Sequence, residues 1–515
     1  MFEKLVKTLL KSKIESMDDI TRISRKVAGE FKMPSPAISK ILKTYREMLK
    51  KEKIKRKKVL EYFLVKRRVR TLSGVAIITV LTKPFDCPGK CVYCPSEKDM
   101  PKSYLSNEPA AMRAKLLKFN PYKQVYKRIR ALEDNGHPTD KIELIVKGGT
   151  WSAYETKYQN WFIKRCFEAC NERKSKNLES AQKINERAKH RVVGLTLETR
   201  PDCVNPNEIK HLREMGCTRV ELGVQTVYNN ILHLVKRGHK AEDVIQATKL
   251  LKNAGFKVDY HLMPMLPGST SKKDFEMFKE IFKNSDYKPD MVKIYPCAVV
   301  PDSQLYKLWK QKKYKPYSNK KLVELLIRVK SEIIPRYCRI SRLIRDIPSE
   351  SIVAGNRITN LREMIQGEMK KRGLKCKCLR CREIGHNLGA KLPHGSLAPK
   401  LFTDKYKASG GTEYFLSFED SKRKVVYAFL RLRISSKDTA FIRELHTYGH
   451  LVPIGGVNNK SVQHKGLGKK LMKEAEKIAR QKKCKKVSVI SGVGVRGYYK
   501  KLGYGQEETY MVKSI

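Results

Sequence analysis

The sequence has no run of about 18 or more consecutive apolar residues, so it offers no candidate for a membrane-spanning helix. The first seven residues also lack the long apolar core of a secretory signal. No repeat of about 20–50 residues is visible. We therefore expect a soluble, cytoplasmic protein, and its 515 residues suffice for two or three domains.

Acidic residues are scarce, since 52 Asp and Glu stand against 109 Lys and Arg, a formal net charge of +57. This excess predicts a polyanionic partner, because neutralising phosphates releases counterions and favours binding. A generally basic proteome, an adaptation to salt or general solubility would give the same composition. Charge alone does not say which nucleic acid is bound.

Residues 1–70 form a basic segment with 22 Lys and Arg against 8 Asp and Glu. Apolar residues recur there at helical spacing, and Pro34 and Pro36 interrupt the pattern. We expect a helical nucleic-acid-binding module; the alternative is a helical adaptor with a solvated face. The candidate contacts are Lys50, Lys51, Lys53, Lys55, Arg56, Lys57 and Lys58.

From residue 73 onward, short β-rich runs alternate with stretches long enough for helices, such as 109–132 and 205–216. Such units predict a parallel sheet, open or barrel-like, with functional residues at the carboxyl ends of its strands. A basic, Cys-rich stretch and a Gly/Pro-bearing stretch then mark a boundary. Residues 400–515 predict another α/β domain, with a helix over 469–482 between β-rich runs at 450–454 and 487–490.

Thirteen cysteines in a protein expected in the cytoplasm should be thiols or metal ligands rather than disulfides. Cys87, Cys91 and Cys94 form a CxxxCxxC motif after the first β-rich run. Thiolates at this spacing can ligate three irons of a 4Fe–4S cluster and leave the fourth iron open to a chelating molecule such as S-adenosylmethionine. The alternative is a structural zinc knuckle without a visible fourth ligand.

The motif resembles that of the radical S-adenosylmethionine superfamily. The resemblance implies that residues at the ends of successive β-rich runs contact the cofactor, with glycines that allow close backbone approach. Taken singly, a glycine pair is more often a turn, and a glutamate can be a satisfied ion pair. The candidates are Lys147, Gly148, Gly149, Glu198, Arg200 and Gln225, with Lys147 and Arg200 as candidate catalytic residues.

A second cysteine cluster, Cys376, Cys378 and Cys381, lies outside the strand pattern. Three thiolates this close need only one distant ligand to complete a tetrahedral zinc site, which would be structural. Cys338 is the candidate for that ligand, and His386 is the alternative. A second iron–sulfur cluster and unliganded surface cysteines are the competing interpretations.

A glycine-rich turn precedes the helix expected over 469–482, and such a turn presents backbone N–H groups suited to pyrophosphate. The order of elements around it resembles the GCN5-related N-acetyltransferase superfamily, whose QxxGxG/A turn binds acyl-CoA. Tyr499 matches a late tyrosine that can protonate the leaving thiolate; Tyr498 is either a second cofactor contact or part of the core. The turn consists of Gln463, His464, Lys465, Gly466, Leu467 and Gly468.

The two domains in this order resemble the family of the Elongator complex catalytic subunit, from about residue 70 to the C-terminus. Matching stretches include 197–202, 235–239, 345–348 and 510–513. The resemblance implies a radical-SAM partial (βα) barrel fused to a GNAT α/β domain, with a helical basic N-terminal region. The expected divisions are a tRNA-binding region over 1–70, a radical SAM domain over 71–335, a zinc-binding linker over 336–399 and an acetyl-CoA-binding domain over 400–515.

This resemblance implies an enzyme that modifies the wobble uridine in the anticodon stem-loop of tRNA. A 5′-deoxyadenosyl radical would take hydrogen from the acetyl methyl of acetyl-CoA, the carbon radical would add to uridine C5, and thioester hydrolysis would leave 5-carboxymethyluridine. The reaction needs an electron donor. The protein would be a stand-alone prokaryotic or archaeal member, as a homodimer or with Elongator-type subunits.

Two other functions remain open at this point. One is a protein lysine acetyltransferase whose iron–sulfur domain is structural or regulatory, with Glu444 as a possible base. The other is a tRNA-binding scaffold with vestigial cofactor sites. Lys236, Arg237 and His239 either line the radical site or form a solvated basic turn.

Overall fold

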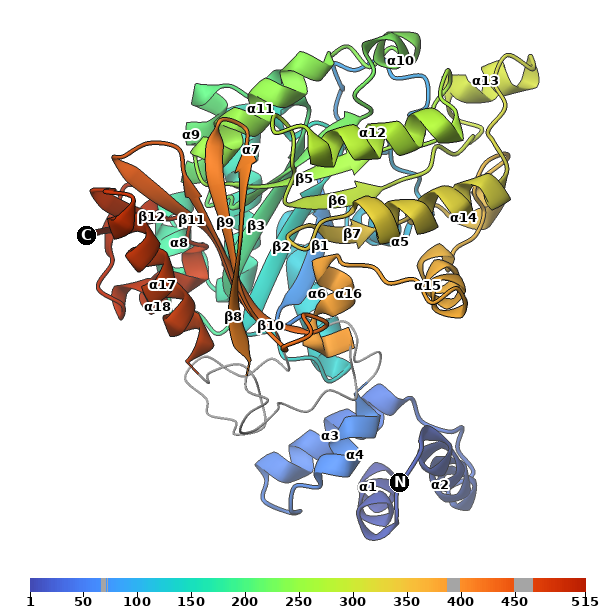
Figure 1. Cartoon of the computed structure of the whole chain (residues 1–515). Coiled ribbons are helices and arrows are strands. Elements are labelled where there is room, and N and C mark those ends of the chain that lie inside the picture. Colours follow the sequence, from blue (N-terminus) through green and yellow to red (C-terminus); the bar gives the residue numbers. More distant parts are fainter. Residues whose placement is uncertain (66–70, 72, 387–398, 449–465) are drawn as a thin grey trace.

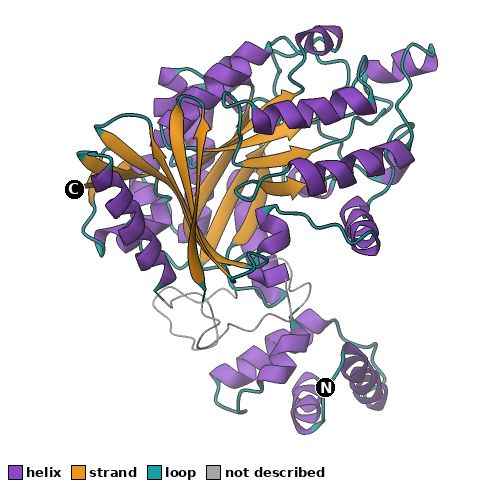
Figure 2. Ribbon diagram, viewed as in Figure 1, coloured by secondary structure: helices purple, strands orange, loops and turns teal. Residues whose placement is uncertain are grey.

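The computed structural model describes residues 1–65, 71, 73–386, 399–448 and 466–515. Its helices and strands form an N-terminal helical group, a large parallel sheet covered by helices, and a second, mixed sheet (Figures 1 and 2). Among the described residues, no helix is both long and apolar enough to cross a membrane.

The N-terminal group has four helices, α1 (Phe2–Lys11), α2 (Met17–Glu30), α3 (Ile38–Lys50) and α4 (Lys58–Leu64). Their apolar residues at helical spacing bury a small core of their own. The Ser16 hydroxyl accepts a hydrogen bond from the Asp19 N–H and caps α2. The Arg46 guanidinium donates to the Glu133 carbonyl oxygen at 2.7 Å, which ties the group to the parallel sheet's helices.

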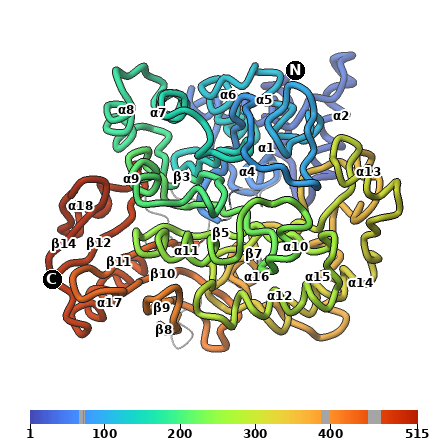
Figure 3. Tube along the Cα trace, turned by 90° about the horizontal axis from the view of Figure 1, so that it is seen from above, coloured from blue at the N-terminus to red at the C-terminus, as the bar shows by residue number. Residues whose placement is uncertain are grey.

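The first sheet has seven strands in sequence order, and every neighbouring pair is parallel. This arrangement confirms the expected partial (βα) barrel, because each connection returns over the outside of the sheet. Helices surround the strands when the molecule is seen from above (Figure 3). The strands are β1 (Ala76–Leu81), β2 (Lys141–Lys147), β3 (Arg191–Thr199), β4 (Arg219–Gln225), β5 (Lys257–Leu262), β6 (Met291–Ile294) and β7 (Arg339–Arg342).

The stretch 109–132, which the sequence analysis found long enough for helices, is occupied by two of them, because Pro121 begins a new helix at its first position. Strand β7, Arg-Ile-Ser-Arg, was not expected, since it lacks the apolar run of a buried strand. The helices are α5 (Pro109–Leu116), α6 (Pro121–Asp134), α7 (Thr156–Asn171), α8 (Leu178–Asn185), α9 (Pro206–Glu214), α10 (Asn229–Leu234), α11 (Ala241–Asn253), α12 (Ser271–Lys283), α13 (Gln304–Lys310), α14 (Asn319–Arg328), α15 (Leu361–Lys371) and α16 (Leu379–Arg382).

The second sheet has the order β13-β14-β12-β11-β10-β9-β8. Strands β8 to β11 pair antiparallel, whereas β11 and β12 pair parallel. The run expected at 450–454 lies outside the described residues. The elements are β8 (Lys400–Ala408), β9 (Gly411–Glu419), β10 (Val426–Ile434), β11 (Thr439–Thr447), α17 (Leu467–Gln481), β12 (Lys486–Val489), α18 (Arg496–Lys500), β13 (Gly505–Glu507) and β14 (Tyr510–Ser514).

The two sheets pack closely against each other. A Cβ atom on Gly492 would lie 2.1 Å from the Val193 carbonyl oxygen, and one on Gly494 would lie 2.5 Å from the Arg191 Cβ. Only glycine allows the backbone of the second domain to approach β3 so closely. The main hydrophobic core continues across this contact and includes Phe429 of β10.

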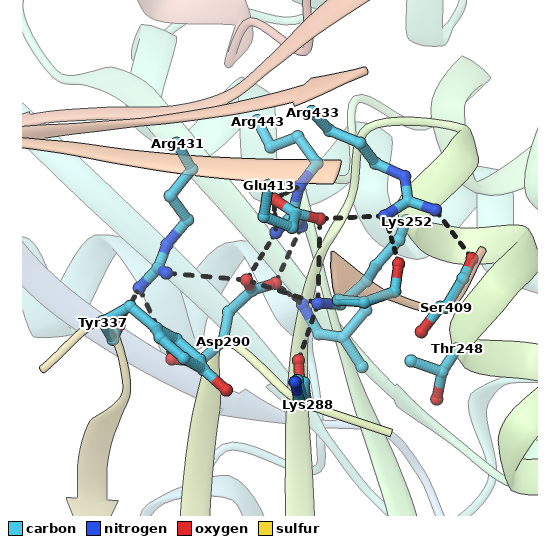
Figure 4. Close-up of polar contacts among 12 residues, drawn as sticks. Thr248, Lys252, Lys288, Asp290, Tyr337, Ser409, Glu413, Arg431, Arg433 and Arg443 are labelled. Atoms are coloured by element: carbon cyan, nitrogen blue, oxygen red, sulfur yellow. Dashed lines mark hydrogen bonds and ion pairs between the residues drawn. The ribbon is translucent and has the colours of Figure 1, made fainter. Parts of the chain in front are cut away.

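A buried group of charges also joins the two sheets (Figure 4). Asp290, directly before β6, pairs with Arg443 of β11 at 2.8 Å and lies 3.6 Å from Arg431 of β10. Glu413 of β9 binds Arg443 and Arg433, each at 3.0 Å. All five side chains are at most 1% exposed, so each charge relies on its partners rather than on water.

Candidate functional site

One cavity of about 1550 Å³ extends from the first cysteine motif to the glycine-rich turn at the start of α17. Its lining includes Cys91 and Arg200 on the side of the parallel sheet, and Gly468 and Tyr499 on the side of the second sheet. Alternate residues of the parallel strands line this space along their length, from Lys141 and Arg219 at the starts of β2 and β4 to Lys147 and Gln225 at their ends. The predicted radical site and the predicted acetyl-CoA site therefore share one cavity.

Cys87, Cys91 and Cys94 lie in the loop after β1, where Cys91 is buried and the other two are partly buried. The Arg237 guanidinium donates to the Cys91 sulfur at 3.5 Å and to the Gly223 carbonyl oxygen. The Cys94 thiol and then the Arg237 charge lower the pKa of Cys91 to about 5, so Cys91 is a thiolate at neutral pH. Arg237 therefore lines the candidate cluster site and is not part of a solvated turn.

Arg200 also faces the cysteine loop. Its Nε and Nη2 donate to Asp202 at 3.0 and 2.8 Å, whereas its buried Nη1 has no hydrogen-bond partner among the described residues. That Nη1 lies 2.5 Å from the position that a Cβ on Gly89 would take, between Cys87 and Cys91. An unpaired cationic donor beside three clustered cysteines fits an anionic 4Fe–4S cluster or the carboxylate of its ligand.

The glycines after β2 allow a close backbone approach. Gly148 has φ +138°, and a Cβ there would lie 1.8 Å from the Thr82 hydroxyl oxygen. Gly149 has φ +94°, and Gln225 at the end of β4 has φ +70°. All three conformations are unusual for ordinary residues, and Gly149 and Gln225 line the cavity.

Glu198 is held in a charged group centred on Glu221, a residue that the sequence analysis did not select. Lys147 pairs with Glu198 at 2.9 Å and with Glu221, while the His261 Nε2 lies 2.9 Å from Glu221. Lys293 also pairs with Glu221. The group was missed because its members come from five strands, β2 to β6, whose register only the fold defines.

The same group sets the ionisation of its members. Burial opposes charge on Glu198, but the Lys147 and His261 charges outweigh it and hold the pKa of Glu198 far below its usual range. Burial lowers the pKa of Lys293 to about 8, although Glu221 opposes this shift. Lys147 is engaged by two carboxylates and therefore acts as a counter-charge in this arrangement.

The second sheet places the turn before α17 beside two tyrosines. Gln463, His464 and Lys465 lie outside the described residues, whereas Gly466 caps α17 with φ +78° and Leu467 begins it. A Cβ on Gly468 would lie 3.0 Å from the Tyr498 hydroxyl oxygen, so the helix start, Tyr498 and the cavity adjoin. Burial raises the pKa of Tyr499, which keeps its phenol protonated and able to donate.

Glu444 of β11, the possible base of a lysine acetyltransferase, is already paired. It accepts from Arg431 at 2.8 Å and lies 3.4 Å from Lys257. Burial opposes its charge, but Lys257 and Arg431 outweigh this and lower the pKa of Glu444 to about 2. A carboxylate this acidic is a weak proton acceptor.

The second cysteine cluster is assembled in space. The ligand atoms of Cys376, Cys378 and Cys381 all lie within 4.8 Å of one another. The sulfur of Cys338 is not in that group, although the Cys338 carbonyl oxygen accepts the Leu379 N–H at 2.9 Å. His386 ends a short 3-10 turn, Ile384–His386.

The basic N-terminal run lies at the end of α3 and in the connection to α4. Most of its side chains are exposed, with Lys53 near Glu3 at 3.5 Å and Arg56 bound to Glu61 at 2.9 Å. Lys57 differs, because its ammonium donates to the carbonyl oxygens of Leu10 and Ser12 and so joins α1 to α4. Lys50, Lys51, Lys55 and Lys58 are exposed and form no ion pair within the described part of the chain.

Family models match three consecutive parts of the chain. The radical SAM superfamily matches residues 84–281, the Radical_SAM C-terminal domain matches 289–371, and the acetyltransferase (GNAT) family matches 392–504. These matches confirm the two domain types that the motifs predicted.

Similar curated proteins span nearly the whole chain. A tRNA uridine(34) acetyltransferase of Methanocaldococcus infernus is 49% identical over 99% of this chain and 96% of its own length. Elongator complex protein 3 of Homo sapiens is 36% identical over 99% of this chain and 96% of its own length. The similarity therefore includes the N-terminal helices, which the sequence-based comparison from about residue 70 had left out.

A solved structure supports the fold. The archaeal Methanocaldococcus infernus Elp3 with residues 1–46 deleted superposes with a TM-score of 0.76 and is 48% identical, covering 86% of this chain and all of that one.

Proposed function

This chain belongs to the family of the tRNA uridine(34) acetyltransferases and Elongator complex protein 3, and from this membership we propose that it carboxymethylates the wobble uridine of tRNA. It is an enzyme with a radical SAM domain and an acetyltransferase domain. The proposed reaction joins the acetyl group of acetyl-CoA to uridine C5 and yields 5-carboxymethyluridine. The proposed setting is the cytoplasm, with tRNA as the polyanionic partner.

The single cavity shared by the two domains carries this proposal. A lysine acetyltransferase would need only the half of the cavity beside α17, whereas carbon–carbon bond formation needs both halves open to each other. Glu444, the candidate base for the alternative reaction, is paired with Arg431 and Lys257. The geometry thus favours the joint reaction.

Residues in the two halves of the cavity would have different roles. Cys87, Cys91 and Cys94 would hold a 4Fe–4S cluster, which supplies the electron that cleaves S-adenosylmethionine to a 5′-deoxyadenosyl radical. The unpaired Nη1 of Arg200 is positioned to bind an anionic group beside that loop. The N–H groups of the Gly466 turn would bind the pyrophosphate of acetyl-CoA, and the protonated Tyr499 phenol would protonate the leaving sulfur.

The test is an anaerobic assay of the protein after iron–sulfur reconstitution, with reductant, S-adenosylmethionine, acetyl-CoA and tRNA. We expect mass spectrometry of the digested tRNA to show carboxymethylated uridine that depends on all three small molecules. Unmodified uridine, together with acetylated lysine formed without S-adenosylmethionine, would instead establish the acetyltransferase alternative.

The exposed N-terminal lysines are expected to bind tRNA phosphates. Replacing Lys50, Lys51 and Lys55 by alanine should weaken tRNA binding by about 10-fold or more and reduce the slope of log affinity against log salt by roughly 3, because each phosphate contact contributes about one released counterion. Filter binding across a salt series measures both quantities.

A matched control is the replacement of Lys272, Lys279 and Lys283, three exposed lysines on α12, by alanine. The control removes the same charge from another face of the molecule. Equal losses in the two triple variants would show that the N-terminal run has no special role.

We further propose that Cys376, Cys378 and Cys381 bind a zinc ion with one additional ligand, Cys338 or His386. The clustered sulfurs support this, since thiolates at such separations repel unless a cation joins them. Elemental analysis of the purified protein should find about one zinc per chain, and the Cys378→Ser variant should lose it. Iron bound at this cluster in place of zinc would contradict the assignment.

A further inference from the structure

His446 of β11 lines the shared cavity, and the roles assigned so far do not include it. Side chains alternate between the faces of a strand. The residues on either side of His446 face α17, because the side chains of Leu445 and Thr447 each lie 3.9 Å from the position that a Cβ on Gly468 would take. His446 therefore faces the parallel sheet, where it contacts Ser73.

The hydrogen bond to Ser73 fixes the tautomer of His446. Its Nε2 lies 2.8 Å from the Ser73 carbonyl oxygen, which only accepts, so Nε2 carries the hydrogen and donates it. The Nδ1 then has a lone pair and forms no further hydrogen bond with a described residue. The rings of Phe429, stacked at 5.7 Å, and Tyr448, at 4.5 Å, hold the imidazole in place.

Burial keeps this imidazole neutral. It lowers the pKa of His446, and the charges of Arg339 and Lys257 act in the same direction. Glu444 and the Ser73 carbonyl oxygen oppose the shift. At neutral pH, His446 thus presents an unprotonated nitrogen, whereas Glu444 is occupied by its two cations.

His446 also lies where β11 separates from β12. The two strands pair only from Thr439 to Ile442 on β11, and β11 continues to Thr447 without β12 beside it. The cavity reaches this opening, which is lined by residues 444–448 of β11, by Ile490 after β12, and by the start of α17. A thioester whose pyrophosphate is held at the Gly466 turn would have to pass this opening to reach the parallel sheet's half of the cavity.

On the premise of the proposed function, we propose that His446 is the general base that hydrolyses the thioester after the acetyl carbon has joined uridine. Its Nδ1 removes a proton from water as the water oxygen bonds to the thioester carbonyl carbon. The carbon–sulfur bond then breaks, the sulfur leaves with the electron pair, and the Tyr499 phenol protonates it. The products are free CoA and a carboxymethyl group. The new carboxylic acid ionises and its proton restores the Tyr499 phenol, while the proton on His446 passes to solvent.

The His446→Gln variant tests this role because it keeps the size of the side chain and removes the base. In the anaerobic assay under single-turnover conditions, 5′-deoxyadenosine should form at about the wild-type rate. Release of free CoA should fall about 100-fold, and tRNA carrying a uridine–acetyl–CoA thioester should accumulate, visible by mass spectrometry. A histidine with only a structural role would not cause that adduct to accumulate.

The matched control is His211→Gln on α9, a partly buried histidine that binds Gln159 at 2.7 Å outside the cavity lining. It should release CoA at the wild-type rate. Modification of uridine with wild-type CoA release in the His446 variant would overturn the proposed base and leave the enzyme's function standing. Wild-type protein that makes neither 5′-deoxyadenosine nor modified uridine would remove the proposed function itself.

A second measurement uses unaltered protein and so does not depend on folding of the variant. Burial lowers the pKa of His446 from its ordinary value, so the hydrolysis step in wild type should slow in acid, where the base form is lost. The charged and titratable groups around His446 are Glu444, Glu143, Arg339, Lys257 and Tyr448, and Glu444, with a pKa of about 2, stays ionised in weak acid. A hydrolysis rate that instead rises as the pH falls would rule out His446 as the base.

Discussion

Replacing Cys91 by alanine should abolish uridine modification completely. Cys91 is the buried thiolate at the centre of the motif, with Arg237 donating to its sulfur at 3.5 Å. Two remaining thiolates cannot hold a cluster whose fourth iron must stay open, so radical formation should stop. Iron content per chain and the tRNA nucleosides, measured on the same reconstituted sample, check the expectation.

The control for this variant is Cys170→Ala, a buried cysteine in α7 away from the cavity. It should retain the cluster and the activity, because its thiol only packs in the core. Acetyl-CoA binding should survive in both variants, since the α17 turn belongs to the other sheet. Carboxymethylated uridine produced by the Cys91 variant would show that the first motif is not the radical site.

Replacing Asp290 by asparagine should destabilise the protein by about 3–5 kcal/mol, which is the usual loss when one member of a buried ion pair is removed. The Asp290 carboxylate accepts a hydrogen bond from the Arg443 guanidinium at 2.8 Å and lies near Arg431 and Lys252. All four side chains are almost fully buried. The asparagine is isosteric but leaves these cations without a counter-charge. Denaturant unfolding followed by circular dichroism measures the change.

The pH dependence of the free energy of unfolding distinguishes a loss of charge pairing at Asp290 from a loss of side-chain packing. Burial opposes ionisation of Asp290, but Arg443 and Lys252 outweigh it and hold its pKa well below the usual range. A depressed folded-state pKa contributes stability above the unfolded value of about 4, and this contribution is lost as pH falls below it. The difference between wild type and Asp290→Asn should therefore shrink in acid.

Asp274→Asn is the matched control, since Asp274 is equally buried but binds only neutral groups, the Ser269 and Tyr317 hydroxyls and the Met265 N–H. Burial raises the pKa of Asp274, so neutralising it should cost much less. Equal destabilisation by the two variants would mean that side-chain shape, and not charge pairing across the domains, accounts for the effect.

The sequence by itself determined the two domain types and their cofactor motifs. The spacing of Cys87, Cys91 and Cys94 and the glycines around Gly468 are local patterns, because ligands and helix starts are set by neighbouring residues. The alternation of β-rich and helical runs likewise predicted the parallel sheet. The polar strand β7 escaped prediction because its pairing with β6, rather than its own composition, makes it a strand.

Only the tertiary structure decided which charged residues act together. Glu221, Lys293 and His261 come from different strands, and Asp290 lies more than a hundred residues from Arg443. The sequence around Arg237 is compatible with either a solvated turn or a buried site. The hydrogen bond from Arg237 to the Cys91 sulfur shows that Arg237 lies in the buried site. Such pairings depend on strand register and on how the two sheets pack against each other, and the spacing of residues along the sequence encodes neither of these. The shared cavity, and the position of His446 in it, could therefore be found only from the fold.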